Sequence, residues 1–191
     1  MCIVIDTAEN RKMEEGYKQA TIFAKIAFFL AIVAFLLDMI GFYTPYWQSY
    51  QFMTNHLVWV TEFDGIWRFC TANMFKVWCR SYNYGTSYSN YGTRSWFEAT
   101  QAFETLGFIA ALAALVLIVL YIFVPQTSGK RIICILSMLA CFAAAGCIML
   151  GIIIYGSKVE RNLSWSFALC CIAGIIFGVS GVLLLIDMVK K

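Results

Sequence analysis

The sequence predicts an all-α transmembrane four-helix bundle that carries a small extracellular antiparallel β-sheet. Three observations lead to this fold class. Of the 191 residues, 61% are hydrophobic and 13% are charged, which is more apolar surface than a soluble domain of this size can bury. Four apolar runs are each long enough to cross about 30 Å of hydrocarbon as a helix. The stretch between the first two runs is rich in β-branched and aromatic residues with turn signals, as in short strands.

A single membrane domain is expected, with spans at about 22–43, 102–124, 132–155 and 165–189. Lys130 and Arg131 lie in the short loop between the second and third spans, and further basic residues precede the first span and follow the fourth. The positive-inside rule therefore predicts that this loop and both termini are cytoplasmic. The loops at about 44–98 and 156–164 then face outward.

Four strands are expected in the first outward loop, at residues 50–54, 57–63, 65–71 and 75–82, with a turn at Asn55-His56. Cys70 and Cys79 would face each other across the second hairpin, in a compartment where oxidation is expected. Their disulfide should contribute about 2–3 kcal/mol. A metal site is the alternative for this pair, but two thiols with one nearby histidine, His56, make a poor ligand set.

The end of this loop has a different composition. Residues 81–94 are rich in Tyr, Gly, Ser and Asn, and we expect a solvated, variable segment there; an adaptable contact surface is the alternative. The sequence Ser95-Trp96-Phe97-Glu98 then has the capping-box pattern of a helix start. A helix from Trp96 to Val124 is about 43 Å long, so its first two turns should project beyond the membrane.

Asn162-Leu163-Ser164 in the second outward loop is the only glycosylation sequon. It lies a few residues from the fourth span. We expect steric exclusion of the transferase there, and hence no modification of Asn162.

Two acids, Asp38 and Glu104, lie at outer-leaflet depth, where a charge is costly and points to a function. They could share a proton or a cation, or bond to backbone and loop donors; we favour a structural role. Asp187, near the other end of its span, has Lys190 and Lys191 at helical spacing. The cysteines within the spans are interpreted as small packing residues: Cys134, Cys141, Cys147, Cys170 and Cys171.

Several function classes are disfavoured. A net charge of +3 is too weak for a nucleic-acid binder. The chain has one histidine and no nucleophile elbow, phosphate loop or HExxH motif, so no enzyme activity, no cofactor and no metal is expected.

One set of residues has a spacing that is specific enough to suggest a protein family. Trp47 is followed by Gly65-Ile66-Trp67, and then by Cys70 and Cys79. This arrangement in the first outward loop resembles the signature of the claudin superfamily, with Ile66 as a conservative departure. The resemblance implies a left-handed four-helix bundle, a bridged cysteine pair, and a sheet wedged onto the helix ends by the two tryptophans and the glycine. The resemblance implies no enzyme activity.

For function, the resemblance implies a plasma-membrane protein at cell–cell contacts that acts in adhesion or as a paracellular barrier or pore. Its expected partners are the lipid bilayer, further copies in cis or trans, and related claudin-like proteins. Arg80, directly after the second cysteine, would disfavour cations along such a path; a solvated arginine at a strand end is the alternative. An auxiliary subunit of the gamma type, which modulates an ion channel or receptor, is the second hypothesis. Two features depart from claudins. The second outward loop is very short, and the stretch from Thr100 to Glu104 lacks the arginine that is usual where the second span enters the membrane.

Overall fold

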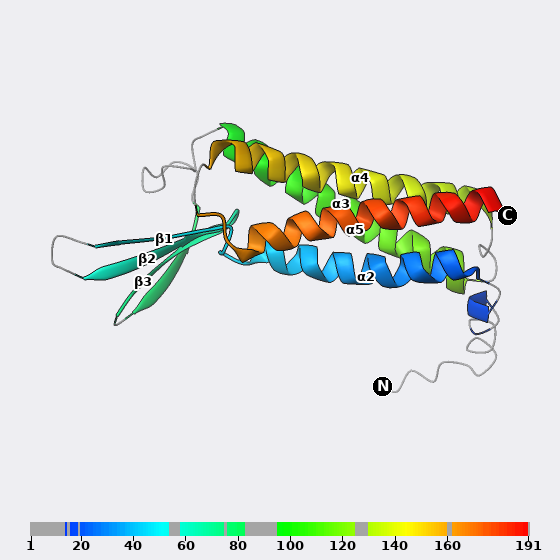
Figure 1. The fold of residues 1–191 in the computed structure, drawn as a ribbon, viewed down its shortest axis with the longest axis horizontal. Helices are drawn as coiled ribbons and strands as arrows, with labels where there is room; N and C mark the ends of the chain where they lie inside the picture. The colour runs from blue at the N-terminus through cyan, green and yellow to red at the C-terminus, as the bar shows by residue number, and fades with distance from the viewer. Residues whose placement is uncertain are drawn as a thin grey trace.

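The computed structural model describes residues 14, 16–18, 20–53, 58–74, 76–82, 95–124, 130–159 and 162–190. Within these residues the chain forms four long helices: α2 (Ile22–Tyr43), α3 (Ser95–Phe123), α4 (Arg131–Lys158) and α5 (Trp165–Lys190). They run side by side as an elongated bundle, with a β-sheet at one end and the start of α2 and end of α5 at the other (Figure 1). All four are long and apolar enough to cross a membrane, so the chain is a multi-pass membrane protein.

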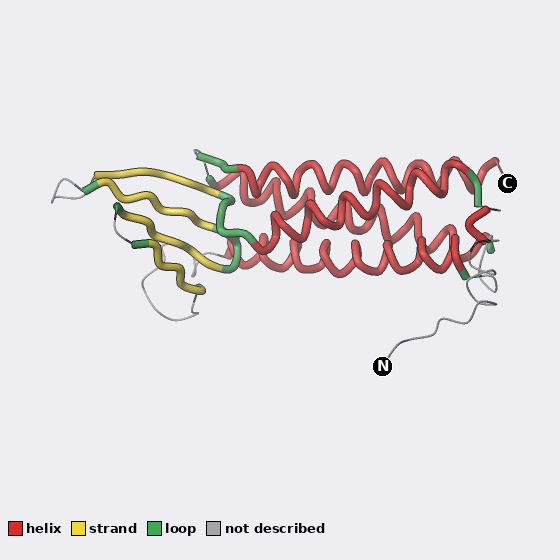
Figure 2. Tube along the Cα trace, turned by 90° about the horizontal axis from the view of Figure 1, so that it is seen from below, coloured by secondary structure: helices red, strands yellow, loops and turns green. Residues whose placement is uncertain are grey.

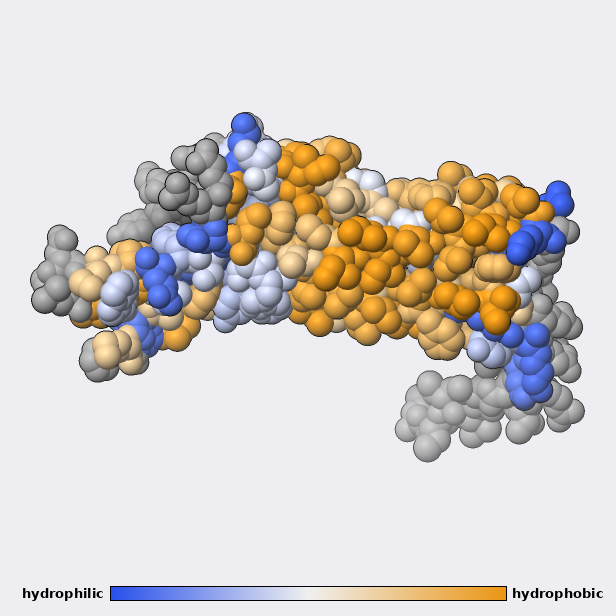
Figure 3. Space-filling model, in the orientation of Figure 1, coloured by the Kyte–Doolittle hydropathy of each residue, from blue (hydrophilic) through white to orange (hydrophobic). Residues whose placement is uncertain are grey.

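The bundle packs small residues inside and presents large apolar residues outside. In α2 most of the fully buried positions are alanines at helical spacing, among them Ala24, Ala27 and Ala31, whereas Phe29 and Leu36 are exposed. Close approach of helix backbones through small residues is how helices associate in lipid. The outer surface of the bundle is correspondingly hydrophobic, and hydrophilic residues gather near its two ends and on the sheet (Figure 3).

The described part of the first loop forms a four-stranded antiparallel meander in the order β1-β2-β3-β4. Its strands are β1 (Gln48–Met53), β2 (Trp59–Asp64), β3 (Arg68–Asn73) and β4 (Val77–Ser81). The sheet extends away from the helix ends along the length of the molecule (Figure 2). In the β3–β4 pairing Cys70 lies directly opposite Cys79.

The element bounds follow the predictions with small shifts. The helix α3 begins at Ser95, ahead of the span expected at 102, as the capping pattern indicated. The third strand begins at Arg68 instead of residue 65, because Gly65 and Ile66 turn the chain between β2 and β3 and the Gly65 N–H donates to the Arg68 carbonyl. The expected turn at Asn55-His56 and the tyrosine-rich segment after Tyr82 lie outside the described residues.

Candidate functional site

Trp47 anchors the sheet on the bundle. It directly precedes β1, has no exposed surface, and its indole Nε1 donates to the Gly41 carbonyl at 2.8 Å, near the end of α2. Its ring meets Tyr155 of α4 and Phe167 of α5 edge-on, at centroid distances of 5.0 and 5.7 Å. One side chain therefore contacts three helices at the point where the sheet leaves the bundle.

A second anchor lies between β2 and β3. Ile66 is fully buried, and its carbonyl accepts a hydrogen bond from Nε2 of Gln101 on α3 at 2.6 Å. Trp67 packs half-buried against the same core. Gly65 is needed for the close approach of two loop segments, since a Cβ there would lie 2.7 Å from Cα of Pro45. The residues of the sequence signature thus hold the sheet from two sides.

Gln101 was missed as an anchor by sequence reasoning. In the sequence, the stretch from Thr100 to Glu104 differs from the claudin pattern only in lacking an arginine. The available signal was an amide side chain in the second turn of the helix, which is a costly group to bury without a partner. Its partner, the Ile66 carbonyl, is distant in sequence and is identified only by the fold.

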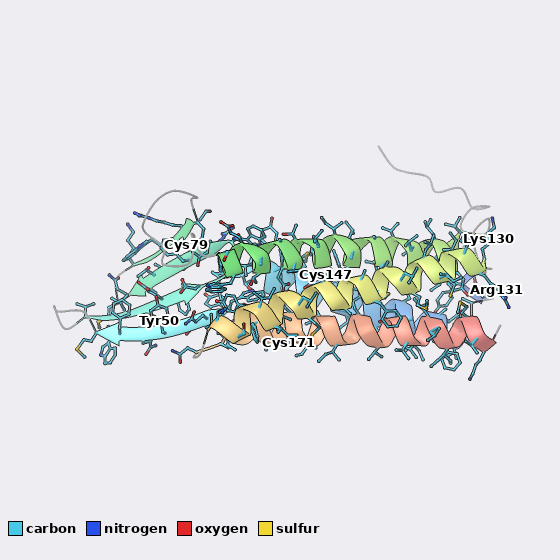
Figure 4. The ribbon with its side chains drawn as sticks, turned by 90° about the horizontal axis from the view of Figure 1, so that it is seen from above. Tyr50, Cys79, Lys130, Arg131, Cys147 and Cys171 are labelled. Carbon is cyan, nitrogen blue, oxygen red and sulfur yellow. A yellow bond between two sulfur atoms is a disulfide. The ribbon has the colours of Figure 1, made fainter. Side chains whose placement is uncertain are left out.

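Cys70 and Cys79 form a disulfide between β3 and β4. The prediction of a disulfide is confirmed, and the alternative of a metal site at this pair is wrong because both sulfurs are used in the bridge. Figure 4 labels Cys79 on the sheet. Arg80 follows on β4, opposite Phe69, and its side chain is exposed on a strand whose residues are all exposed.

Four exposed apolar side chains gather at the end of the sheet that points away from the bundle. Met53 ends β1, Trp59 begins β2, Met74 follows β3 and Val77 begins β4. Their exposed fractions are 46%, 56%, 78% and 64%. We call these four residues the apolar tip. Exposed apolar clusters of this kind mark interaction sites.

The second outward loop adds to the sheet at β1. The carbonyl of Asn162 accepts a hydrogen bond from the Ser49 N–H at 3.0 Å, and Leu163 forms a bridge with Gln48. Asn162 has a φ of 65°, a left-handed conformation that asparagine tolerates better than most residues. Its side chain is exposed, and the expectation that it carries no glycan stays a prediction.

Asp64 is a buried acid at the base of the sheet, 7% exposed. Burial, and to a lesser extent the charge of Glu62, raise the pKa of its carboxyl, and the Tyr82 hydroxyl lowers it; the net pKa is about 6. Between the ordinary pKa and about 6, the folded state binds more protons than the unfolded state. The contribution of Asp64 to stability is therefore fully present below about pH 4 and is lost as the pH rises through about 6.

We accordingly expect Asp64→Asn to stabilise the protein at pH 7.5 by an amount of the order of 1–3 kcal/mol, because the substitution removes a buried charge. Thermal unfolding in detergent at a series of pH values measures this effect. The gain should shrink toward zero near pH 4, where the wild-type carboxyl is protonated in both states. A gain that is equal at pH 4 and pH 7.5 would contradict this assignment.

Asp38 of α2, Glu104 of α3 and Cys170 of α5 come together inside the bundle near its sheet end. All three are fully buried, and one ligand atom of each lies within 4.8 Å of the others. None of the four carboxylate oxygens has a hydrogen-bond partner among the described residues. Of the two alternatives, no backbone or loop donor for these acids is found among the described residues, which leaves a shared proton or cation. Cys170 was interpreted only as a packing residue, because nothing in the sequence places it beside the acids.

Asp187 sits at the opposite end of the bundle, and its expected pairing with Lys190 is also wrong. The carboxylate is 1% exposed and accepts hydrogen bonds from Tyr121 of α3, at 2.7 Å, and from Thr21, the N-cap of α2. Lys190 points elsewhere, with Nζ over the ring of Phe23 at 4.5 Å. Lys191 lies outside the described residues. Asp187 thus ties three helices together.

The two anchors and the disulfide hold a small sheet beyond one end of a membrane bundle, with an apolar tip facing away from it. Such a surface is suited to contact with another protein. The chain matches no protein-family model and no curated protein.

Proposed function

We propose that this is a non-enzymatic, claudin-like membrane protein at cell–cell contacts, which acts in adhesion or as a paracellular barrier through its first outward loop. The observation that carries the proposal is the apolar tip. When the helices cross the bilayer, the tip lies beyond their ends, so its side chains have no lipid to cover them and are not buried among the described residues. A facing copy, in cis or in trans, would supply that cover.

The charges and cysteines support the outward orientation of the sheet. Lys130 and Arg131 lie at the end of the bundle remote from the sheet, as Figure 4 shows. Basic residues favour the cytoplasmic side of a membrane. The disulfide of Cys70 and Cys79 lies at the other end, as is typical of an oxidising compartment. Both features favour a plasma-membrane protein whose sheet faces the space between cells.

The anchors support the claudin-like assignment. In the resemblance, Trp47, Gly65 and Trp67 wedge the sheet onto the helix ends. In this chain Trp47 bonds to the end of α2, Gly65 permits the close approach to Pro45, and Trp67 packs against the core. The contacts of these three residues therefore agree with the structural roles that the resemblance implies.

Mixed cell culture tests the contact role. The tagged protein is expressed in cells without claudins of their own, and its density is compared at borders between two expressing cells and at borders with non-expressing cells. We expect several-fold enrichment at the former. Trp59→Ser combined with Val77→Ser should abolish the enrichment at equal surface expression, whereas Gln51→Ser, an exposed residue of β1, should not. Equal density at both kinds of border would contradict the proposal.

Arg80 provides a prediction about charge selectivity. Its exposed guanidinium on β4 would repel cations from a path along the sheet. In a conducting monolayer, Arg80→Glu should shift the permeability ratio of sodium to chloride toward sodium, as measured by dilution potentials. Arg80→Lys keeps the charge and should leave the ratio unchanged. If Arg80→Glu has the ratio of the wild type, Arg80 does not line the path.

An auxiliary subunit that modulates an ion channel or receptor is the second candidate. A hollow of about 640 Å³ on the outer face of α3, beside the sheet, favours it, because a lateral partner could dock there. The hollow is lined by Trp67, Glu98, Gln101, Ala102, Thr105 and Leu106. Stoichiometric co-purification with a channel, together with no enrichment at cell borders, would favour this function over the first.

A further inference from the structure

We propose that Asp38, Glu104 and Cys170 form a binding site for a divalent transition-metal ion of the zinc class, buried in the bundle beneath the sheet. The site goes beyond the proposed contact function and does not depend on it. It would join α2, α3 and α5 at the depth where the sheet is anchored.

The geometry is convergent. The three residues come from three different helices, and a carboxylate oxygen of each acid and the Cys170 sulfur lie within 4.8 Å of one another. Asp38 is one turn before Gly41, the residue whose carbonyl bonds to Trp47. Figure 4 labels Cys171, the chain neighbour of Cys170, in the half of the bundle nearer the sheet. The cluster therefore lies directly below the anchor of the sheet.

The buried acids need a ligand that the described residues do not supply. Both side chains have 0% exposed surface, and all four carboxylate oxygens lack a hydrogen-bond partner among the described residues. Neither acid forms an ion pair with a described basic residue. Among the described residues, the ion pair that is found joins Lys18 and Glu14. A pair of buried, uncompensated carboxylates is costly, and a cation between them removes that cost.

Two glycines leave the space in which the ligand atoms sit. A Cβ on Gly151 of α4 would lie 2.5 Å from the Glu104 Oε1. A Cβ on Gly41 of α2 would collide with the Cys170 sulfur and lie 2.8 Å from the Ser166 carbonyl. The side chains of Glu104 and Cys170 are thus packed against the backbone of these two glycines. This packing keeps both side chains close to Asp38.

The donor set selects the ion. Two carboxylate oxygens and one thiolate suit zinc and its transition-metal neighbours, which accept sulfur and oxygen together. Calcium and magnesium prefer oxygen ligands alone and more of them. The thiol loses its proton on coordination, so the occupied site has a formal charge of minus one, the same as a Cys₃His zinc site. Three protein ligands leave one position of a tetrahedral ion open.

Cobalt(II) is the probe, because a thiolate bound to cobalt gives a charge-transfer absorption in the near ultraviolet that oxygen ligands do not give. The purified full-length protein in detergent, stripped with a chelator, is titrated with cobalt chloride. We expect one equivalent of cobalt to produce the band, and one equivalent of zinc to remove it. Cys170→Ser should abolish the band, and Asp38→Asn and Glu104→Gln should each weaken binding by more than about tenfold.

Two matched variants serve as controls. Cys141→Ser changes an equally buried thiol on α4, and Asp187→Asn changes a buried acid that already has partners. Both should keep the band at wild-type affinity. If Cys170→Ser does not fold, Cys170→Ala takes its place, since alanine brings no hydroxyl into the core.

Two results would overturn the proposal. One is a folded wild-type protein that gives no thiolate band with excess cobalt, which would mean that the acids hold protons in place of a metal ion. The other is a band that persists in a folded Cys170 variant and in both acid variants, which would place the metal elsewhere in the chain.

Discussion

Replacement of Trp47 by alanine is expected to lower the free energy of unfolding by about 3–5 kcal/mol, the cost of removing a large, fully buried aromatic side chain. The substitution removes the contacts with Tyr155 and Phe167 and leaves the Gly41 carbonyl without its indole donor. Trp47→Phe keeps most of the ring and loses only the N–H, so about 1 kcal/mol is expected for it. Thermal unfolding in detergent, followed by near-ultraviolet circular dichroism, measures both changes.

Trp165 is the matched control for Trp47. It is also a tryptophan at the junction of sheet and bundle, but it is 47% exposed and its ring stacks on Tyr46. Trp165→Ala should therefore cost much less than Trp47→Ala. If the two alanine variants unfold at the same temperature, Trp47 is not the anchor of the sheet.

Loss of the disulfide is expected to cost about 2–3 kcal/mol, because it frees a hairpin that is otherwise closed by the bridge. The test is the double variant Cys70→Ser with Cys79→Ser, which leaves no unpaired thiol in the sheet. We expect a lower unfolding temperature and reduced surface expression. In the wild type, reduction should change the mobility on a gel, and this shift should be absent in the double variant.

Cys147→Ser changes a half-buried free cysteine of α4 and is the control for this experiment. It should keep both the surface expression and the mobility shift of the wild type. Unchanged stability, surface expression and mobility in the double variant would show that the bridge does not support the sheet.

Much of the fold follows from patterns that are local in the sequence. The span of α2 at 22–43 was predicted at both ends, because a continuous apolar run has only one way to satisfy its backbone in lipid. The opposition of Cys70 and Cys79 follows from the position of the turn between their two strands, which fixes the register of the hairpin. The start of α3 at Ser95 follows from its capping pattern.

The contacts that build the candidate sites could not be predicted in the same way, because they depend on the rotation of one helix against another. Asp187 has basic neighbours in sequence, yet its rotation points it at Tyr121 across the bundle. Cys170 meets Asp38 and Glu104 only because α2, α3 and α5 pack with those faces together. A run of apolar residues in a span has a weak sequence periodicity, so the inward face is not marked in advance.

The central claim, that the sheet acts between cells, is tested most directly by transepithelial resistance in an epithelial line that lacks its own claudins. Surface expression is matched between the wild type and the variant of the apolar tip, Trp59→Ser with Val77→Ser. We predict that the wild type changes the resistance relative to untransfected cells and that the tip variant does not. An unchanged resistance, in cells where the wild type reaches the contacts, would contradict the claim.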